Sequence, residues 1–238
     1  MMQQPERLAV RLVEKLKNWN KLRRSANNKP QVYIVPGNFA YIPVPKCATR
    51  SINDLLAHTL LEGQQQQKAD KQTIALLKQQ YAHHIPKHEI RKRIGSLYTF
   101  AIIRHPLERL FSAYKNKVLT DNPKTKVNIF AKHNIPLNID FLEFVERVCQ
   151  IPDKYIDRHL RSQTWYLCDD AGLIPDQLIR LENFAREWPE ISRKLRLATP
   201  PVYNATSSKL LPQMNDYHKQ LLMNRYKQDF RYLGYDEI

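Results

Sequence analysis

Two segments of the sequence contain the residue types that bind phosphate or sulfate. The first is residues 45–51, which read PKCATRS, and the second is residues 104–114, which read RHPLERLFSAY. Each follows a short apolar run and opens a pattern of apolar residues at helical spacing. The N-terminus of a helix presents free backbone N–H groups and the positive end of the helix dipole, and both attract anions. Two such segments predict a ligand with an anionic group at each end.

The first segment does not match two well-known phosphate-binding loops. A Walker-type loop needs glycines before its lysine, whereas no glycine lies between Gly37 and Gly63, so ATP hydrolysis of that type is disfavoured. Only two residues separate Cys47 from Arg50, which is too few for a tyrosine-phosphatase loop. What remains is Lys46 at a strand end, followed by small and hydroxyl residues that can surround a tetrahedral anion. Lys46 can then neutralise charge that develops on a leaving group.

The elements that position these segments follow from hydrophobic periodicity. Strands are predicted at 31–35 and 40–44 around a turn at 36–38, and the buried run 97–103 leads into Arg104. Pro106 fits the first turn of a helix. Alternating strands and helices predict an α/β fold, with residues 31–238 as one domain in which helices flank a central parallel sheet. Further elements are predicted as helices at 51–61, 73–81, 141–149, 184–195 and 214–232 and as a strand at 177–181.

Residues 1–30 are predicted to form a separate N-terminal segment. Apolar and basic residues alternate at helical spacing from Pro5 to about Arg24, which indicates a basic amphipathic helix, and residues 25–30 have the composition of a linker. The helix is expected to pack on the domain or on a second subunit. Peripheral contact with a membrane surface is the alternative.

Composition narrows the class of partner and the compartment. The 238 residues carry a formal net charge of +15, which predicts polyanionic partners such as a nucleotide, an acidic polysaccharide, a nucleic acid or an anionic membrane. Three cysteines without framework spacing favour a reducing compartment, and we expect a cytoplasmic protein. No apolar run approaches the roughly 20 residues of a membrane span. Cys47 is expected to be a small buried filler, and the alternative is a pKa lowered by its neighbours Lys46 and Arg50, with sensitivity to oxidation.

Both segments resemble the nucleotide-binding motifs of sulfotransferases that use 3′-phosphoadenosine 5′-phosphosulfate (PAPS). Residues 45–51 fit Pro-Lys-x-x-x-x-Ser, and residues 104–114 fit the more specific Arg-x-Pro-x-x-Arg-x-x-Ser-x-Tyr. The sequence is most similar to the carbohydrate sulfotransferases of the sulfotransferase family 2 type. Later blocks that resemble this family are DRHLRSQ at 157–163, LENF at 181–184 and YKQDFRYLGYD at 226–236. The resemblance implies a P-loop-NTPase-like sulfotransferase fold.

The resemblance also implies which residues bind PAPS. Arg104 and Ser112 would bind the 3′-phosphate, and Ser208 and Lys209 would close over the nucleotide. Many relatives have glycine at the position of Ala48, so Ala48 is expected to have a negative φ. The second arginine and the tyrosine of the later motif, Arg109 and Tyr114, are expected to support packing. The loop for the 5′-phosphosulfate would consist of Lys46, as the catalytic cation, with Ala48, Thr49, Arg50 and Ser51.

Sulfuryl transfer to an alcohol also needs a base beside the acceptor hydroxyl. Residues 81–90 resemble the family segment in which a histidine precedes a glutamate by five positions, and His84 has that spacing to Glu89. His84 is therefore the expected base and His83 the alternative. His84 and His88 are four residues apart, but Pro86 between them breaks a helix, so a metal site is not expected. The acceptor side would be lined by His83, His159, Arg161 and Gln163.

The expected reaction is in-line transfer of a sulfuryl group from PAPS to a hydroxyl acceptor without a metal, with adenosine 3′,5′-bisphosphate (PAP) as product. A carbohydrate acceptor is favoured, whereas a phenol, a lipid and a peptide tyrosine stay open, and nucleic acid is not an expected partner. Two other classes remain. A small-molecule kinase predicts dependence on ATP and magnesium, and a non-catalytic polyanion-binding module predicts salt-dependent binding without nucleotide specificity. Oligomeric state is left open.

Overall fold

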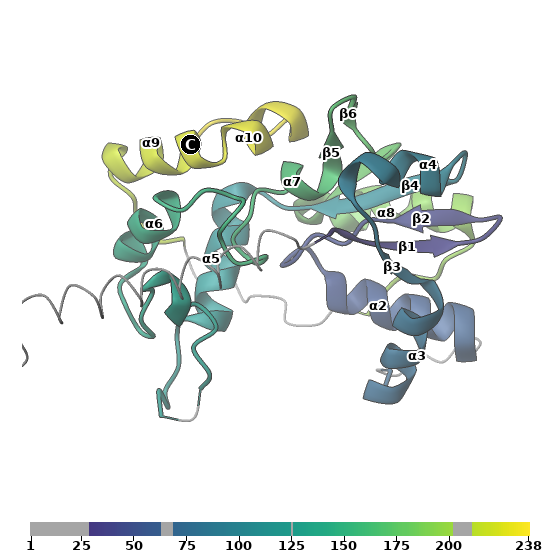
Figure 1. Ribbon diagram of the computed structural model, residues 1–238, viewed down its shortest axis with the longest axis horizontal. Helices are drawn as coiled ribbons and strands as arrows, with labels where there is room; N and C mark the ends of the chain where they lie inside the picture. Colours follow the sequence, from purple (N-terminus) through teal and green to yellow (C-terminus); the bar gives the residue numbers. More distant parts are fainter. Residues whose placement is uncertain (1–28, 63–68, 125, 202–210) are drawn as a thin grey trace, which may run out of the picture.

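The computed structural model describes residues 29–62, 69–124, 126–201 and 211–238. A five-stranded sheet with helices around it stands beside a mainly helical half that contains α5, α6, α9 and α10 (Figure 1). The α/β fold expected from the sequence is confirmed. The predicted N-terminal helix, Ser208 and Lys209 lie outside the described residues.

The sheet has the strand order β3-β1-β2-β4-β7. Its core is parallel, because β2 pairs in parallel with β4 and β4 pairs in parallel with β7. The expected central parallel sheet is confirmed for this core, and the whole sheet is mixed because β1 is antiparallel to both β2 and β3. A turn as short as Pro36-Gly37-Asn38 can only reverse the chain, since a parallel pair needs a long crossover. The strands are β1 (Gln31–Val35), β2 (Phe39–Tyr41), β3 (Ala82–His84), β4 (Tyr98–Ile103) and β7 (Gln177–Arg180).

The principal helices begin where their capping residues predict. Pro106 occupies the first turn of α5, and the side chain of Asp140 caps α6 by accepting from Leu142 N at 2.7 Å. The predicted C-terminal helix is two helices, with the break at Tyr226. The helices are α2 (Thr49–Ala57, continued by a π-helical turn, His58–Glu62), α3 (Lys71–Tyr81), α5 (Pro106–Lys117), α6 (Phe141–Cys149), α8 (Phe184–Leu195), α9 (Asp216–Arg225) and α10 (Lys227–Leu233).

Several short elements complete the fold, and they are too short to show a hydrophobic period in the sequence. A two-stranded hairpin of two-residue strands follows a single helical turn, and a one-turn helix precedes β4. The strand β3 also escaped prediction, because two of its three residues are exposed histidines. These elements are η2 (Lys87–Glu89), α4 (Ile90–Ile94), η3 (Ala131–His133), α7 (Thr164–Leu167), β5 (Cys168–Asp169), β6 (Gly172–Leu173) and η4 (Leu181–Asn183).

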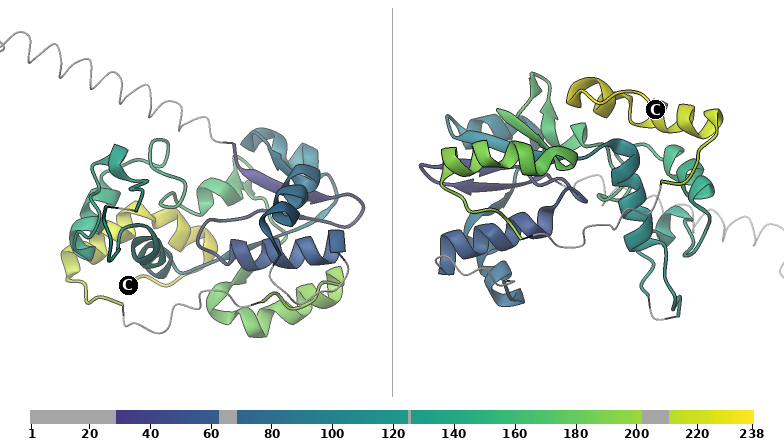
Figure 2. Two further views of the ribbon diagram at one scale, coloured as in Figure 1. Left: turned by 90° about the horizontal axis from the view of Figure 1, so that it is seen from below. Right: turned by 180° about the vertical axis from the view of Figure 1, so that it is seen from behind.

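Buried apolar side chains form two clusters, one for each half. In the sheet half, the ring centroids of Tyr41 and Phe100 are 5.1 Å apart, and Trp188 of α8 contacts the edge of Phe100. In the helical half, the ring of Phe141 lies 5.1 Å from the ring of Tyr114 of α5. Seen from behind, α8 (light green) lies across the sheet, while α5 and α6 stand to its side (Figure 2, right). The junction of β4 with α5 therefore joins the two halves.

None of the described helices has the length and apolar character that a membrane span requires.

Candidate active site

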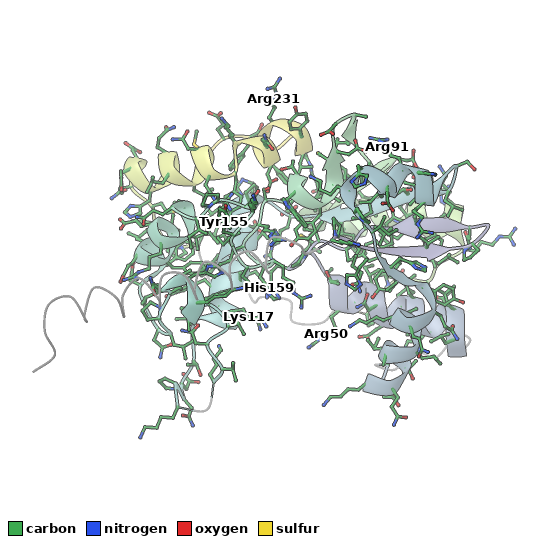
Figure 3. The ribbon with its side chains drawn as sticks, in the orientation of Figure 1. Arg50, Arg91, Lys117, Tyr155, His159 and Arg231 are labelled. Carbon is green, nitrogen blue, oxygen red and sulfur yellow. The ribbon has the colours of Figure 1, made fainter. Side chains whose placement is uncertain are left out.

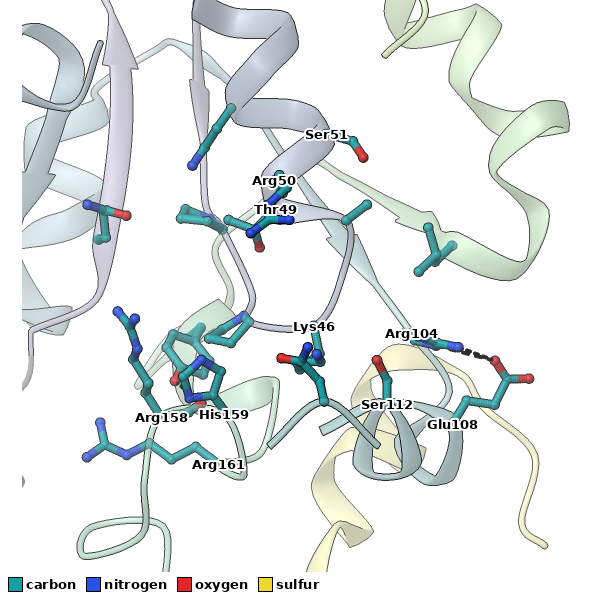
Figure 4. Close-up of a pocket in the computed structure, with 18 of the residues that line it drawn as sticks. Lys46, Thr49, Arg50, Ser51, Arg104, Glu108, Ser112, Arg158, His159 and Arg161 are labelled. Carbon is teal, nitrogen blue, oxygen red and sulfur yellow. Dashed lines mark hydrogen bonds and ion pairs between the residues drawn. The ribbon is translucent and has the colours of Figure 1, made fainter. Parts of the chain in front are cut away.

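A cleft of about 1050 Å³ receives residues from both halves. Arg50 approaches it from the sheet half, and Lys117 and His159 approach it from the helical half (Figure 3). The structure brings both anion-binding segments into this one cleft (Figure 4). The residues expected from the sequence that line it are Lys46, Ala48, Thr49, Arg50, Ser51, His84, Arg104, Ser112, His159 and Arg161.

The loop between β2 and α2 has a backbone shaped for an anion. Lys46 and Ala48 have φ values of 72° and 51°, so the expected negative φ of Ala48 is wrong. Left-handed backbone costs an alanine about 1–2 kcal/mol, which explains why glycine is suited to this position. A left-handed residue followed by a right-handed one, here Ala48 and Thr49, turns successive N–H groups toward one point.

The N-terminus of α2 is available to such an anion. No side chain caps this helix among the described residues, so the N–H groups of its first turn still need partners. The hydroxyl of Thr49 donates to the carbonyl of Val44 at 2.9 Å, and Cys47 N donates to the same carbonyl at 3.2 Å. These two hydrogen bonds lie within the loop and stabilise its turn, so the Thr49 hydroxyl and Cys47 N already have an acceptor. The backbone N–H groups and Lys46 are therefore the donors that the loop offers to a ligand.

Lys46 lies in a field of positive charge. Burial, and next to it the neighbouring cations Lys117, Arg104 and Arg109, together lower the pKa of Lys46 to about 8. A half-buried ammonium group beside other cations is destabilised until an anion compensates it. The loop thus favours a ligand of high negative charge.

Arg104 follows the last residue of β4, and its guanidinium is held by Glu108 of the next helix, α5. Nε and Nη2 both donate to Glu108 Oε2 at 3.3 Å, and Figure 4 shows this contact beside the hydroxyl of Ser112. No hydrogen bond of the described residues uses Nη1 of Arg104. A guanidinium forms paired hydrogen bonds with phosphate oxygens. Glu108 orients the group while one edge stays open toward the cleft.

Gln163 does not face the cleft, so its expected contact with an acceptor is wrong. Its side chain is fully buried, and its amide pairs with the backbone N–H and C=O of Arg104. Arg104 N donates to Gln163 Oε1 at 2.9 Å, and Gln163 Nε2 donates to Arg104 O at 2.7 Å. The thiol of Cys47 donates to the same Oε1 at 3.4 Å. Gln163 thus connects the two anion-binding segments.

Arg109 makes a second connection between the same segments. It is only 2% exposed, and its Nε donates to Pro45 O at 2.9 Å while Nη1 donates to Arg161 O at 2.6 Å. The expected packing role of Arg109 is confirmed, as is that of Tyr114, whose hydroxyl donates to Ile139 O at 2.8 Å. The sequence motif does not indicate which segments Arg109 joins.

Cys47 is an inert thiol in this environment. It is fully buried, and burial raises its pKa to about 12 in spite of the nearby cations Arg109 and Arg104. The expected buried filler is confirmed. The alternative of a lowered pKa is wrong, because the sequence neighbours Lys46 and Arg50 line the cleft while the thiol lies in the core. Thiolate chemistry is not available at Cys47.

Two adjacent histidines of β3 differ in their access to the cleft. His84 pairs in register with Gln31 of β1, and both side chains line the cleft. His83 is exposed but does not line it, because successive side chains of a strand point to opposite faces. Of the two histidines expected near the acceptor, His84 is therefore the one that lines the cleft.

The wall opposite His84 consists of polar and aromatic residues. His159 Nδ1 lies 2.7 Å from Asp157 Oδ1, and burial lowers the pKa of this histidine, which favours the neutral imidazole. The guanidinium carbon of Arg161 lies 4.3 Å from the ring centroid of Trp165. Sequence reasoning missed two more residues that line the cleft: Trp165, which belongs to no motif, and Arg158, which lies in the 157–163 block but was given no role. Among the residues described, no group of His, Cys, Asp and Glu side chains is arranged for a metal ion.

Comparison with known proteins identifies a family. The sequence profile described as "Sulfotransferase family" matches residues 36–236. Among solved structures, a sulfotransferase from Alicyclobacillus acidocaldarius aligns with 84% of this chain and 95% of its own, at 14% identity and a TM-score of 0.42. No curated protein matches the sequence.

Loss of the Gln163 amide should destabilise the fold. Gln163→Leu leaves the buried N–H and C=O of Arg104 unpaired, so we expect the free energy of unfolding to fall by about 2–4 kcal/mol. Gln163→Glu keeps the acceptor for Arg104 N but buries a carboxylate against Arg104 O, so we expect a loss at least as large. Urea denaturation measures both, with the exposed Gln79→Leu of α3 as control. If the free energy of unfolding fell no more for Gln163→Leu than for the control, the hydrogen bonds between Gln163 and Arg104 would not stabilise the fold.

Proposed function

The chain belongs to the sulfotransferase family, and we propose that it transfers a sulfuryl group from PAPS to a hydroxyl group of a carbohydrate. One observation carries the proposal: the β2–α2 loop with Lys46, and Arg104 with Ser112, line the same cleft. The two segments are joined from behind by Gln163 and Arg109. They therefore form two anion sites in one rigid frame, as a nucleotide with an anionic group at each end requires.

The charges of the cleft suit the two ends of PAPS. The N–H groups at the start of α2 and Lys46 would hold the 5′-phosphosulfate, and the open edge of Arg104 with the hydroxyl of Ser112 would hold the 3′-phosphate. A phosphate monoester carries a charge of about −1.5 to −2 at neutral pH, which offsets the cations that depress the pKa of Lys46. Two apolar residues, Leu181 of η4 and Phe184 of α8, offer a surface for a flat base.

The chemistry is an in-line displacement. His84 accepts the proton of the acceptor hydroxyl while the oxygen of that hydroxyl forms its bond to sulfur. Lys46 and the N–H groups of the loop stabilise the negative charge that builds on the 5′-phosphate oxygen as its bond to sulfur breaks. The products are a sulfate ester and PAP. The scheme has no role for a metal, because these cationic and dipolar groups compensate the developing charge.

The acceptor would lie between His84 and the 158–165 segment. His159, held neutral and oriented by Asp157, can exchange hydrogen bonds with a sugar hydroxyl. Trp165 offers a ring face against which the apolar face of a sugar can pack. These groups support a carbohydrate acceptor.

Substitution of Lys46 should mainly lower the transfer rate, whereas substitution of Arg104 should mainly weaken the affinity for PAP. Lys46→Ala removes charge stabilisation from the leaving group, and we expect the transfer rate to fall about 100- to 1000-fold. Arg104→Ala removes a charge-assisted contact with phosphate, and PAP binding should weaken about 10- to 100-fold. Calorimetry with PAP measures affinity, and labelled PAPS with a panel of acidic and neutral oligosaccharides measures transfer. Negligible effects of both changes, or no labelled product from the unaltered enzyme, would refute the assignment.

His84 and His83 provide a matched pair of variants. His84→Ala removes the proposed base, and we expect transfer to fall about 100-fold or more with PAP affinity unchanged. His83→Ala removes an identical side chain from the other face of the same strand and should keep the wild-type rate. The same labelled-donor assay measures both. Equal rates for the two variants would exclude His84 as the base.

Nucleotide binding should be coupled to protonation of Lys46. Its pKa is about 8 in the folded protein and about 10.5 in an unfolded chain, whereas a bound anion favours the charged form. We therefore expect PAP to bind with proton uptake at pH 8.5 and with falling affinity above pH 8. The ligand-free protein binds fewer protons than its unfolded state between these pKa values, so its stability should rise with pH in that window.

Calorimetry in buffers of different ionisation enthalpy measures the proton uptake at pH 8.5. Lys46→Met serves as the control, because it keeps a long side chain and loses the titrating group. Uptake that persists in Lys46→Met would assign the proton to another residue.

A further inference from the structure

The end of the chain packs against the residue that follows Arg104. The ring of His105 lies edge-on to the rings of Phe230 and Tyr235, with ring centroids 5.7 and 5.4 Å away. Gly234 ends the helix α10 with a left-handed φ of 65°, which turns the chain so that Tyr235 reaches this ring. A tail at the far end of the sequence therefore contacts the start of α5, beside Arg104.

A carboxylate connects this tail to the backbone at the start of α5. Glu182 Oε1 accepts from His105 N at 2.6 Å, and Glu182 Oε2 accepts from the hydroxyl of Tyr235 at 3.3 Å. Glu182 lines the cleft, whereas Tyr235 lies outside its described lining. The carboxylate thus stands between the cleft and the tail, with one oxygen bound to each partner.

Arg180 of β7 holds the same tail from the side of the sheet. Its guanidinium carbon lies 4.9 Å from the ring centroid of Tyr235, and its Nη2 donates to the carbonyl oxygens of Leu233, at 3.4 Å, and of Gly234. A Cβ at Gly234 would lie 3.1 Å from this Nη2, and a left-handed φ disfavours any residue with a Cβ. The ring of Tyr235 is therefore held by Arg180 as well as by His105, which keeps its hydroxyl at Glu182.

The peptide bond between Arg104 and His105 is hydrogen-bonded at both ends. Its C=O accepts from Gln163 Nε2, and its N–H donates to Glu182 Oε1. Because a peptide unit is planar, hydrogen bonds at its two ends fix its plane. Gln163 also accepts from Arg104 N. These three hydrogen bonds fix both backbone dihedral angles of Arg104 and, with them, the direction in which its side chain leaves the backbone.

We propose that Glu182 and Tyr235 are positioning residues for the 3′-phosphate: Tyr235 orients the carboxylate of Glu182, and Glu182 fixes the peptide bond that directs Arg104 toward the cleft. The inference rests on the proposed function, since it concerns how the same cleft holds its nucleotide. A guanidinium that is directed before the ligand arrives loses less freedom on binding, which raises the affinity. The tail therefore contributes to binding of the 3′-phosphate and not to the transfer step.

Two nucleotides that differ only in the 3′-phosphate test this role. PAP carries that phosphate, and adenosine 5′-monophosphate (AMP) lacks it. In Tyr235→Ala we expect the affinity for PAP to fall about 5- to 20-fold and the affinity for AMP to stay within about twofold. Calorimetry measures PAP, and competition with PAP measures AMP. Unchanged affinity for PAP, or an equal loss for PAP and AMP, would overturn the inference.

The transfer step gives a second readout for the same variant. At saturating PAPS, the labelled-donor assay should show a transfer rate for Tyr235→Ala within about twofold of the unaltered enzyme, because positioning of the 3′-phosphate acts on binding. A transfer rate that falls about tenfold or more at saturating PAPS would contradict the proposal.

Matched variants distinguish the hydroxyl of Tyr235 from its ring. Tyr235→Phe keeps the ring contacts with Arg180 and His105 and loses the hydrogen bond to Glu182, so PAP affinity should fall about 2- to 5-fold. Tyr232→Ala removes a tyrosine that is 45% exposed on α10 and should keep the wild-type affinity. A loss in Tyr232→Ala as large as that in Tyr235→Ala would count against the proposal. Urea denaturation establishes that each variant is folded, and Tyr235→Phe replaces Tyr235→Ala if the latter is not.

Variants of Glu182 separate positioning from charge repulsion. A carboxylate repels a nearby phosphate, so repulsion alone predicts tighter PAP binding in both Glu182→Gln and Glu182→Ala. The amide of Glu182→Gln can still accept from His105 N and donate to the Tyr235 hydroxyl, and this variant should bind PAP at least as tightly as the unaltered protein. Glu182→Ala leaves His105 N without this acceptor and should weaken PAP binding about 5- to 20-fold. Tighter PAP binding by Glu182→Ala would refute the positioning role.

The outcomes also separate this inference from the proposed function. If PAP does not bind to the unaltered protein, the proposed function fails and the inference fails with it. If PAP binds and labelled sulfate is transferred, but Tyr235→Ala and Glu182→Ala keep the wild-type affinity for PAP, the proposed function holds and the inference is wrong.

Discussion

The cleft depends on one buried polar junction. Gln163 binds the N–H and the C=O of Arg104, and Arg109 binds the carbonyl oxygens of Pro45 and Arg161. These bonds hold together three segments that are far apart in the sequence, namely the loop at Pro45, residues 104–109 and residues 161–163. Leaving any of these buried groups unpaired costs about 1–3 kcal/mol, so the junction has one low-energy arrangement. The position of the two anion-binding segments relative to each other follows from it.

The C-terminal block holds this junction in place. Asp229 is fully buried and accepts hydrogen bonds from Gln163 N and Thr164 N, each at 2.8 Å. The ring of His105 packs edge-on against Phe230 and Tyr235, with ring centroids 5.7 and 5.4 Å away. The helix α10 thus supports both Gln163 and the residue that follows Arg104.

The frame keeps the cleft in a state that is unfavourable without a ligand. Ala48 has a left-handed backbone conformation that suits glycine better. Burial and neighbouring cations lower the pKa of Lys46, so its charged form is disfavoured. Such local costs are tolerated where the surrounding structure leaves no alternative. In the proposed reaction, donors that are already oriented toward the developing charge would not need to reorganise.

The sequence by itself determined the elements and the two anion-binding segments. Hydrophobic periodicity and capping residues are local signals, and they predicted β1, α6 and α8 with the bounds that the structure has. Only the tertiary structure decided what the polar residues do. Gln163 was expected to face the acceptor, yet it is buried at the junction, and burial also excludes the lowered pKa that was the alternative for Cys47. The exposure of a polar side chain depends on segments that pack against it from elsewhere in the chain, and spacing along the sequence does not contain that information.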